Sequence, residues 1–202
     1  MPRPSQRDRL LDAAMRRLHT QGFNGSGVQD ITADAGIAKG SFYNHFDSKE
    51  SLGAAALEQY FRARTCERMA VLRDISLPPL TRLRRYFDSL AAILAGQGFA
   101  SGCMIGNMAT ELADHSPLIR TQLAAHFAEW TAVIEEVVAE AQAAHALRSD
   151  LPAGTIASFL INAWEGAILR ARVTRDDAPF QEFFAVVFAT LMTVQPQARS
   201  AP

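Results

Sequence analysis

Apolar residues that recur at spacings of three and four constrain the fold of this chain more than any other feature. In the first segment, Leu11, Ala14 and Leu18 follow this spacing, and Gly22 ends the segment. Such spacing places the apolar side chains on one face of an α-helix. The alternation typical of strands is scarce, and the dominant residues (Ala, Leu, Arg, Glu and Gln) favour helix. The sequence therefore predicts an all-α fold.

Glycine and proline divide the chain into nine expected helices. Three short helices occupy about the first 48 residues, with Ser26 expected to cap the second helix and Gly36 to form a tight turn after it at positive φ. Six longer helices are expected beyond them, at Ser48–Asp74, Pro79–Ala95, Met104–Asp114, Pro117–Ala146, Ala153–Val173 and Pro179–Thr193. We accordingly predict one domain at residues 1–48 and a second at residues 49–202.

Composition excludes several classes of protein. The 202 residues carry 20 Lys and Arg against 21 Asp and Glu, a net charge of -1, which excludes a polycation that coats nucleic acid. No apolar stretch is long enough to cross a bilayer, and the N-terminus lacks an apolar signal core, so a cytoplasmic protein without membrane contact is expected. The two cysteines, Cys66 and Cys103, make neither a disulfide framework nor a zinc site. We predict no metal and no cofactor.

Residues 28–46 have the pattern of a helix-turn-helix, with two short helices joined at Gly36. Apolar residues would pack this unit together, which leaves a polar set on its surface. Lys39 has the chemistry to neutralise phosphate or donate to guanine, and Asn44 to pair with an adenine edge. We expect base or adjacent backbone contacts from Lys39, Ser41, Tyr43 and Asn44, phosphate contacts from Ser26, Gln29, His45 and Lys49, and close approach of DNA at Gly40.

The first 17 residues hold five arginines and two aspartates, so a basic arm is expected to reach DNA ahead of the first helix. Residues 1–50 as a whole hold seven basic and six acidic side chains. Because this balance is nearly neutral, DNA affinity is expected to depend on a few placed contacts and on two copies of the chain.

The stretch GVQDITADAGIAKGSFYNHFDSKESL, residues 27–52, resembles the DNA-binding domain of the TetR family of transcriptional regulators. The resemblance implies a homodimer of nine-helix chains, with a C-terminal ligand-binding and dimerisation domain. Such a repressor binds a palindromic operator of double-stranded DNA and leaves it when a small-molecule inducer enters the C-terminal domain. An activator of the same fold and a helical adaptor without regulatory DNA binding are the alternatives. An enzyme using Cys103, Glu111 and His115 ranks lower because no partner pattern supports it.

The segment Gly102 to Ala113 resembles a subgroup that responds to electrophiles or small unsaturated acids, in which the matching cysteine is the sensor in some members. Cys103 is then either a reactive thiol at a helix N-terminus or a small buried packing residue. Aromatic, methionine and nearby polar side chains are candidates for lining a ligand cavity. The predicted ligand-binding residues are Cys103, Met104, Asn107, Met108, Glu111, Phe127, Trp130 and Trp164.

The last two expected helices carry more apolar surface than one face of a helical body needs. Small residues among them permit close helix approach, which fits a four-helix interface between two copies. The predicted interface residues are Leu160, Ile161, Ile168, Phe184, Val187 and Phe188.

Overall fold

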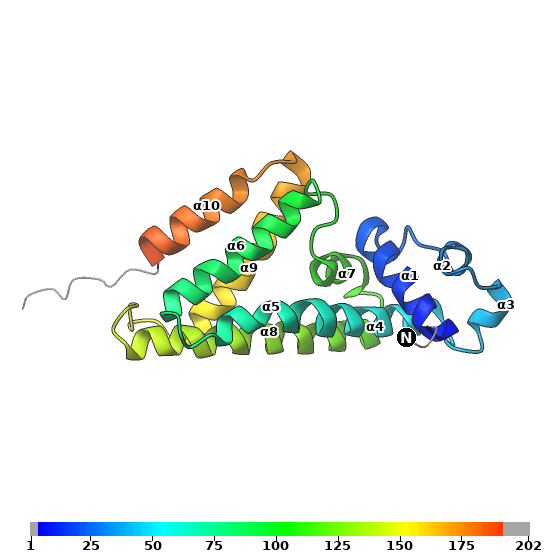
Figure 1. Cartoon of the computed structure of the whole chain (residues 1–202), viewed down its shortest axis with the longest axis horizontal. Helices are drawn as coiled ribbons and strands as arrows, with labels where there is room; N and C mark the ends of the chain where they lie inside the picture. Colours follow the sequence, from blue (N-terminus) through cyan, green and yellow to red (C-terminus); the bar gives the residue numbers. More distant parts are fainter. Residues whose placement is uncertain (1–3, 192–202) are drawn as a thin grey trace, which may run out of the picture. The chain divides into compact units, whose positions relative to one another are not determined.

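The structure is a computed structural model that describes residues 4–191, apart from the side chains of residues 64–67, 190 and 191. Within residues 4–191 every regular element is helical, which confirms the all-α prediction. The helices are α1 (Gln6–Gln21), α2 (Val28–Ala35), α3 (Lys39–Phe42), α4 (Lys49–Tyr60), α5 (Cys66–Met69), α6 (Pro79–Gly96), α7 (Met104–Leu112), α8 (Pro117–Ala143), α9 (Ala153–Thr174) and α10 (Ala178–Val186) (Figure 1).

A π-helical segment, Phe61–Thr65, joins α4 to α5, and a 3-10 segment, Ala70–Arg73, follows α5. When this run from Lys49 is counted as one helix, the described residues form nine helices, as predicted. A second π-helical segment, Val187–Leu191, continues α10. The predicted end of the last helix at Thr193 lies outside the described residues.

Of two serines expected near the starts of helices, one caps its helix and the other does not. Ser48 caps α4, because its hydroxyl oxygen accepts the Ser51 N–H at 3.0 Å. The predicted cap at Ser26 is wrong: Gly27 holds the N-cap position of α2. The Ser26 hydroxyl instead donates to the Gly22 carbonyl oxygen at 2.7 Å, so this side chain closes the turn before the helix.

The chain forms two compact units. Unit 1 comprises residues 1–67 and 99–128, and unit 2 comprises residues 68–98 and 129–202. These units do not divide at residue 48, so the predicted functional boundary there stays a prediction. Among the described residues, no helix combines the length and the apolar character needed to cross a membrane.

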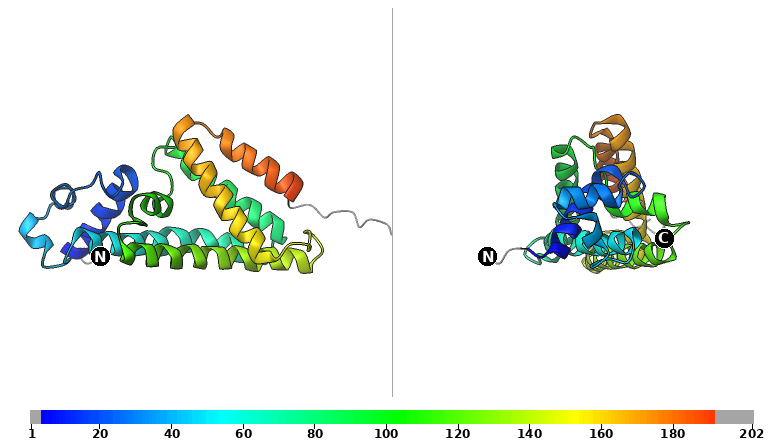
Figure 2. Two further views of the ribbon diagram at one scale, coloured as in Figure 1. Left: turned by 180° about the vertical axis from the view of Figure 1, so that it is seen from behind. Right: turned by 90° about the vertical axis from the view of Figure 1, so that its right-hand side faces the viewer.

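Unit 1 is organised around α1, which packs against α2 and α4 and also contacts α7 (Figures 1 and 2). The apolar stripe predicted for the first helix is buried, with Leu11, Ala14 and Leu18 each at most 6% exposed. Ile31 from α2 and Phe42 from α3 are fully buried in the same unit. The apolar faces of these short helices thus form one core that fixes their outer faces.

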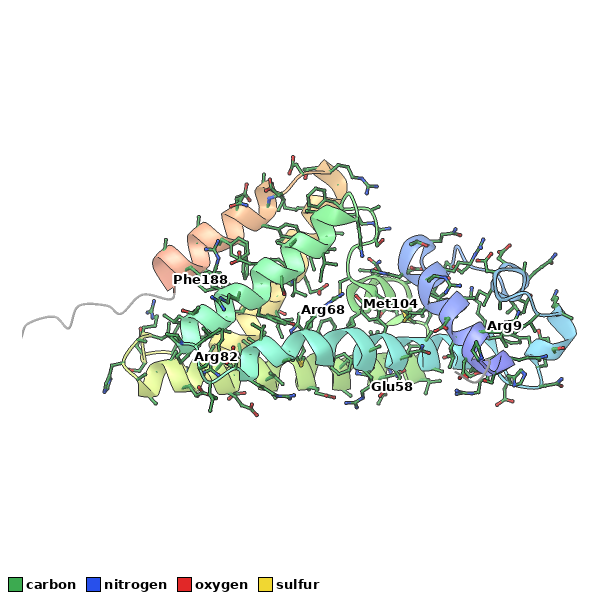
Figure 3. All side chains as sticks on the ribbon, viewed as in Figure 1. Arg9, Glu58, Arg68, Arg82, Met104 and Phe188 are labelled. Carbon is green, nitrogen blue, oxygen red and sulfur yellow. The ribbon has the colours of Figure 1, made fainter. Side chains whose placement is uncertain are left out.

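Unit 2 has an aromatic cluster at its centre. Trp164 of α9 lies stacked on Phe180 of α10, with ring centroids 4.8 Å apart, and meets Phe87 of α6 at 5.1 Å. Arg82, labelled in Figure 3, is 3% exposed; its guanidinium donates to the Leu72 carbonyl oxygen at 2.8 Å and pairs with Glu140 of α8. This ion pair, buried on the Arg82 side and half exposed at Glu140, ties α6 to α8 inside the unit.

Candidate nucleic-acid interface

The turn between α2 and α3 has the geometry that the sequence predicts. Gly36 adopts φ 63° and ψ 41°, the left-handed conformation that costs glycine little. Its N–H donates to the Ala33 carbonyl oxygen at 2.9 Å, and the Ile37 N–H donates to Thr32 at 2.9 Å. These bonds close α2 and start the chain toward α3 in one fixed direction.

The second helix of the motif ends before residue 46, where the predicted helix-turn-helix ends. Regular α-helix ends at Phe42, and the next residues form turns in which the His45 N–H donates to the Phe42 carbonyl oxygen at 2.9 Å. Gly40, a weak helix former, sits inside this four-residue helix. Phe42 and Phe46 still contact each other on the buried side, with ring centroids 5.9 Å apart. We call residues 39–46 the recognition segment.

Most of the predicted DNA contacts lie on the surface of unit 1. Tyr43 is 59% exposed. Gln29, Lys39, Gly40 and Asn44 are also exposed, and a Cβ added at Gly40 would meet no heavy atom within 4 Å. Open space at this position leaves room for a DNA backbone to approach. The surface therefore offers cationic, amide and hydroxyl groups together on one short segment.

Three predicted contacts are half-buried, and one is not accessible at all. Ser41, His45 and Lys49 are half-buried. The His45 Nε2 lies 3.3 Å from Gln6 Oε1 of α1. Ser26 is 0% exposed, so the prediction that it contacts a phosphate is wrong for this arrangement of the chain.

The Lys49 ammonium lies 4.1 Å from the centroid of the Phe23 ring, a cation–π contact. Burial lowers the pKa of Lys49, and the negative charge of Glu111 acts in the opposite direction. Lys49 is thus part of the packing between the start of α4 and the loop after α1, in addition to any role at DNA.

Two arginines of the predicted basic arm serve inside the motif, and sequence reasoning missed this. The Arg9 guanidinium donates to the Gly36 carbonyl oxygen at 3.0 Å and also to that of Ala35 (Figure 3). Arg17 pairs with Asp34 at 2.7 Å. These arginines fix the C-terminal end of α2 from α1. Because the partners lie 17 to 27 residues away along the chain, no local motif indicates the contacts.

The predicted ligand-binding residues are divided between the two units. Unit 1 holds Cys103, Met104, Asn107, Met108, Glu111 and Phe127, and unit 2 holds Trp130 and Trp164. Several of them already have structural partners. Asn107 donates through its amide to the Ser101 carbonyl oxygen at 2.8 Å, and the Glu111 carboxylate accepts two backbone N–H groups. Trp164 belongs to the aromatic cluster of unit 2.

The predicted dimer-interface residues prove to be core residues. Leu160, Ile161, Ile168, Phe184 and Val187 are at most 7% exposed within a single chain, and Phe188 is half-buried. Spacing alone does not separate the inner stripe of a helix from its outer stripe, so their place at a dimer interface stays a prediction; Val187 also lines the groove described next.

A different set of apolar side chains is exposed on the same two helices. Phe159 and Val173 of α9 are 48% and 78% exposed, and Val186 of α10 is 57% exposed. Residues 159, 163, 166, 170 and 173 follow spacings of four and three, which is one face of α9. A groove of about 280 Å³ runs along this face, lined by Phe159, Ala163, Gly166, Ala167, Arg170, Pro179, Glu182, Phe183, Val186 and Val187. The spacing of four and three that marks this face was already present in the sequence.

Comparison with known proteins places the chain in a family. Residues 10–56 match the family described as bacterial regulatory proteins, tetR family, and residues 79–187 match the tetracyclin repressor-like C-terminal domain. The chain is 39% identical over 192 residues to the transcriptional repressor DhaR of a Mycobacterium species, covering 95% of both chains. It is 26% identical to the transcriptional repressor NemR of Escherichia coli, covering 90% of this chain and 91% of NemR.

Solved structures agree with this placement. A TetR regulatory protein from Rhodobacter sphaeroides superposes with a TM-score of 0.83 at 31% identity, covering 89% of this chain and 95% of that one. The reduced form of E. coli NemR also gives a TM-score of 0.83, at 25% identity, covering 94% and 99%. The helix-turn-helix, the helical C-terminal part and these relatives all lead to one conclusion: the chain belongs to the TetR family of bacterial transcriptional regulators.

Proposed function

We propose that the chain is a homodimeric repressor that binds a palindromic operator and is released from it by a small-molecule inducer. The observation that carries the proposal is the recognition segment, where Phe42 and Phe46 are buried while Tyr43 and Asn44 face solvent. Exposed amide, phenol and ammonium groups next to open space at Gly40 are suited to base edges and phosphates. Two relatives that align over at least 90% of the chain, DhaR and NemR, are repressors.

The test is binding of the full chain to a labelled duplex from beside its own coding sequence. We expect nanomolar-range affinity for that duplex, much weaker affinity for a scrambled duplex of the same composition, and a linear fall of log affinity with log salt. Equal affinity for both duplexes would leave only non-specific binding. No binding at low salt would favour the adaptor alternative.

A second copy of the chain is the proposed occupant of the exposed face of α9 and α10. The face combines apolar side chains with the Arg170–Glu182 ion pair, whose Nη1–Oε2 distance is 2.9 Å. An exposed apolar face rimmed by charge is typical of a protein–protein interface. A Val186→Glu variant is expected to shift the mass in solution from dimer to monomer. Ala185→Glu, exposed on α10 and outside the groove, is the matched control.

Cys103 is the proposed sensing group. It occupies the N-cap position of α7, where the partial positive charge of the helix end stabilises a thiolate, and it is 9% exposed. Addition to an activated alkene would form a sulfur–carbon bond, and the thiol proton would end on the neighbouring carbon. A bulky adduct on a buried side chain at the start of α7 would then displace this helix.

N-ethylmaleimide is a suitable probe for the sensing step. Treatment of the wild-type chain is expected to release the operator and to add one maleimide at Cys103, measured by mass spectrometry of peptides. Cys103→Ser is expected to bind the operator as tightly as wild type and to stay bound after treatment. Release from the variant at the wild-type dose would contradict this role for Cys103.

A further inference from the structure

We propose that Glu111 is a positioning residue through which α7 sets the position of the helix-turn-helix. The inference rests on the proposed function and names the contact that would carry its regulation. All the groups involved belong to unit 1.

The Glu111 carboxylate accepts hydrogen bonds from backbone amides of the loop between α1 and α2. Oε1 accepts the Phe23 N–H at 3.1 Å, and Oε2 accepts the Asn24 N–H at 2.7 Å. Hydrogen bonds from neutral donors to a carboxylate are stronger than those between neutral groups. Both carboxylate oxygens are engaged, so binding an inducer through this group would require breaking these bonds.

Gly22 shows that the loop is shaped around this carboxylate. Its φ is +77°, and a Cβ added there would lie 2.2 Å from Glu111 Oε1. A side chain at this position would therefore meet both a strained backbone and the carboxylate. The contact is built into the backbone path and is not a chance approach of a surface side chain.

Two further contacts tie α7 and α4 to the same place. The His19 Nε2 of α1 lies 2.9 Å from the carbonyl oxygen of Gly102, which directly precedes the cap of α7. A Cβ added at Gly53 of α4 would lie 2.9 Å from the Phe23 ring. Helix α7 is thus held to α1 near its start, by the contact between His19 and Gly102, and to the loop after α1 in its last turn, by Glu111.

The loop held by Glu111 leads directly into α2, whose N-cap is Gly27. Met104 and Met108, one turn apart on α7, are fully buried, so α7 does not shift without repacking around them. A displacement of α7 would pull on the Phe23 and Asn24 amides and so move the start of α2. By linkage, operator binding at α2 and α3 must in turn change the stability of α7.

Hydrogen exchange of the full chain, with and without the operator duplex, tests this linkage without an inducer. In wild type, the operator is expected to slow exchange both in α2–α3 and in α7. In Glu111→Gln, the Phe23 and Asn24 amides are expected to exchange about 10- to 100-fold faster in the free chain. The response of α7 to the operator is expected to be lost, while that of α2–α3 remains. Glu136→Gln, which removes an exposed charge on α8, is the matched control and should behave as wild type.

Each other outcome overturns the proposal. An unchanged α7 response in Glu111→Gln would show that the carboxylate does not couple the two sites. Uniformly faster exchange throughout unit 1, with the α7 response reduced no more than that of α2–α3, would reduce Glu111 to a stabilising residue. If wild type shows no operator effect on α2–α3, the proposed function itself fails, which is a distinct result.

Gly22→Ala gives a second variant if Glu111→Gln does not fold. It is expected to reproduce the loss of the α7 response, because the added methyl group displaces the carboxylate. Gly98→Ala is its matched control: Gly98 has φ +60°, and a Cβ there would meet no heavy atom within 4 Å. This control carries backbone strain without the clash. Equal effects of the two alanine substitutions on the α7 response would contradict the proposal.

Discussion

The recognition segment of unit 1 and the aromatic cluster of unit 2 use apolar side chains in opposite ways. In the recognition segment, Phe42 and Phe46 are buried and their polar neighbours Tyr43 and Asn44 face solvent. In the aromatic cluster, Trp164 is fully buried, and some side chains that face solvent on the same helix, such as Phe159 and Val173, are apolar as well. Burial therefore separates apolar from polar side chains in the first region and does not separate them in the second.

Removing the Trp164 side chain should lower the free energy of unfolding more than any other substitution proposed below. A small change would contradict the view that the aromatic cluster is the core of unit 2. Trp164→Ala deletes contacts with the rings of Phe87, Phe180, Phe183 and Phe184. The free energy of unfolding is expected to fall by about 3–5 kcal/mol in denaturant titration. Tyr43→Ala, in the recognition segment, is expected to cost less than about 1 kcal/mol. A cost below about 1 kcal/mol for Trp164→Ala would mean that its neighbours do not form a packed core.

Arg9 tests whether operator binding by the helix-turn-helix depends on a side chain that holds α2 in place from α1. Arg9→Ala removes a charged donor from the Ala35 and Gly36 carbonyl groups at the end of α2. We expect about tenfold weaker operator binding and a loss of about 1.5–3 kcal/mol in the free energy of unfolding. Arg16→Ala, an exposed position on the same helix, is the control for charge alone. Equal effects of the two substitutions would show that Arg9 contributes only its positive charge and does not hold the end of α2.

Lys39 tests the exposed side of the same region. Lys39→Ala should leave the thermal midpoint nearly unchanged, because the side chain is exposed. If Lys39 neutralises one phosphate per chain, the slope of log affinity against log salt should decrease in magnitude by about 0.9 for each copy. An unchanged slope measured by fluorescence anisotropy would remove Lys39 from the DNA contacts.

Glu58 should give the smallest effect. A hydrogen bond from Arg62 at 2.8 Å is the main cause that lowers the pKa of Glu58 below its usual 4.5. A carboxyl group with a lowered folded-state pKa stabilises the fold fully above its unfolded pKa and loses that contribution as the pH falls through the folded value. Glu58→Gln should therefore lower the thermal midpoint slightly at pH 7 and not at pH 3. Because the side chain is 43% exposed, solvent screening limits the effect to about 0.2–1 kcal/mol. A midpoint difference independent of pH would contradict this sign.

The two regions also explain what the sequence could reveal. Gly36, the serine at position 48 and the 3–4 spacing are local signals, and they predicted the turn, the start of the helix at Ser48 and the helical class. The exposed polar set was predictable because the buried partners, Phe42 and Phe46, lie one turn apart in the same short segment.

The remaining features depend on contacts between distant parts of the chain. Nothing near Arg9 or Glu111 indicates that each would hold backbone groups far away in sequence. On α9, Leu160 and Phe159 are neighbours, yet one is buried and the other half exposed, and only the packed structure separates core residues from surface residues. Ser26 was expected to act as a cap because serine favours that position, but its hydroxyl closes the preceding turn.

The central claim is that the recognition segment reads DNA sequence, and Asn44→Ala tests it most directly. The measurement is the ratio of affinities for the operator and for a scrambled duplex, at one fixed salt concentration. A side chain that pairs with a base edge contributes to this ratio, whereas a phosphate contact does not. We expect Asn44→Ala to lower the ratio at least about tenfold with the fold intact. An unchanged ratio for this variant, and likewise for Tyr43→Ala, would contradict the claim that this surface reads base sequence.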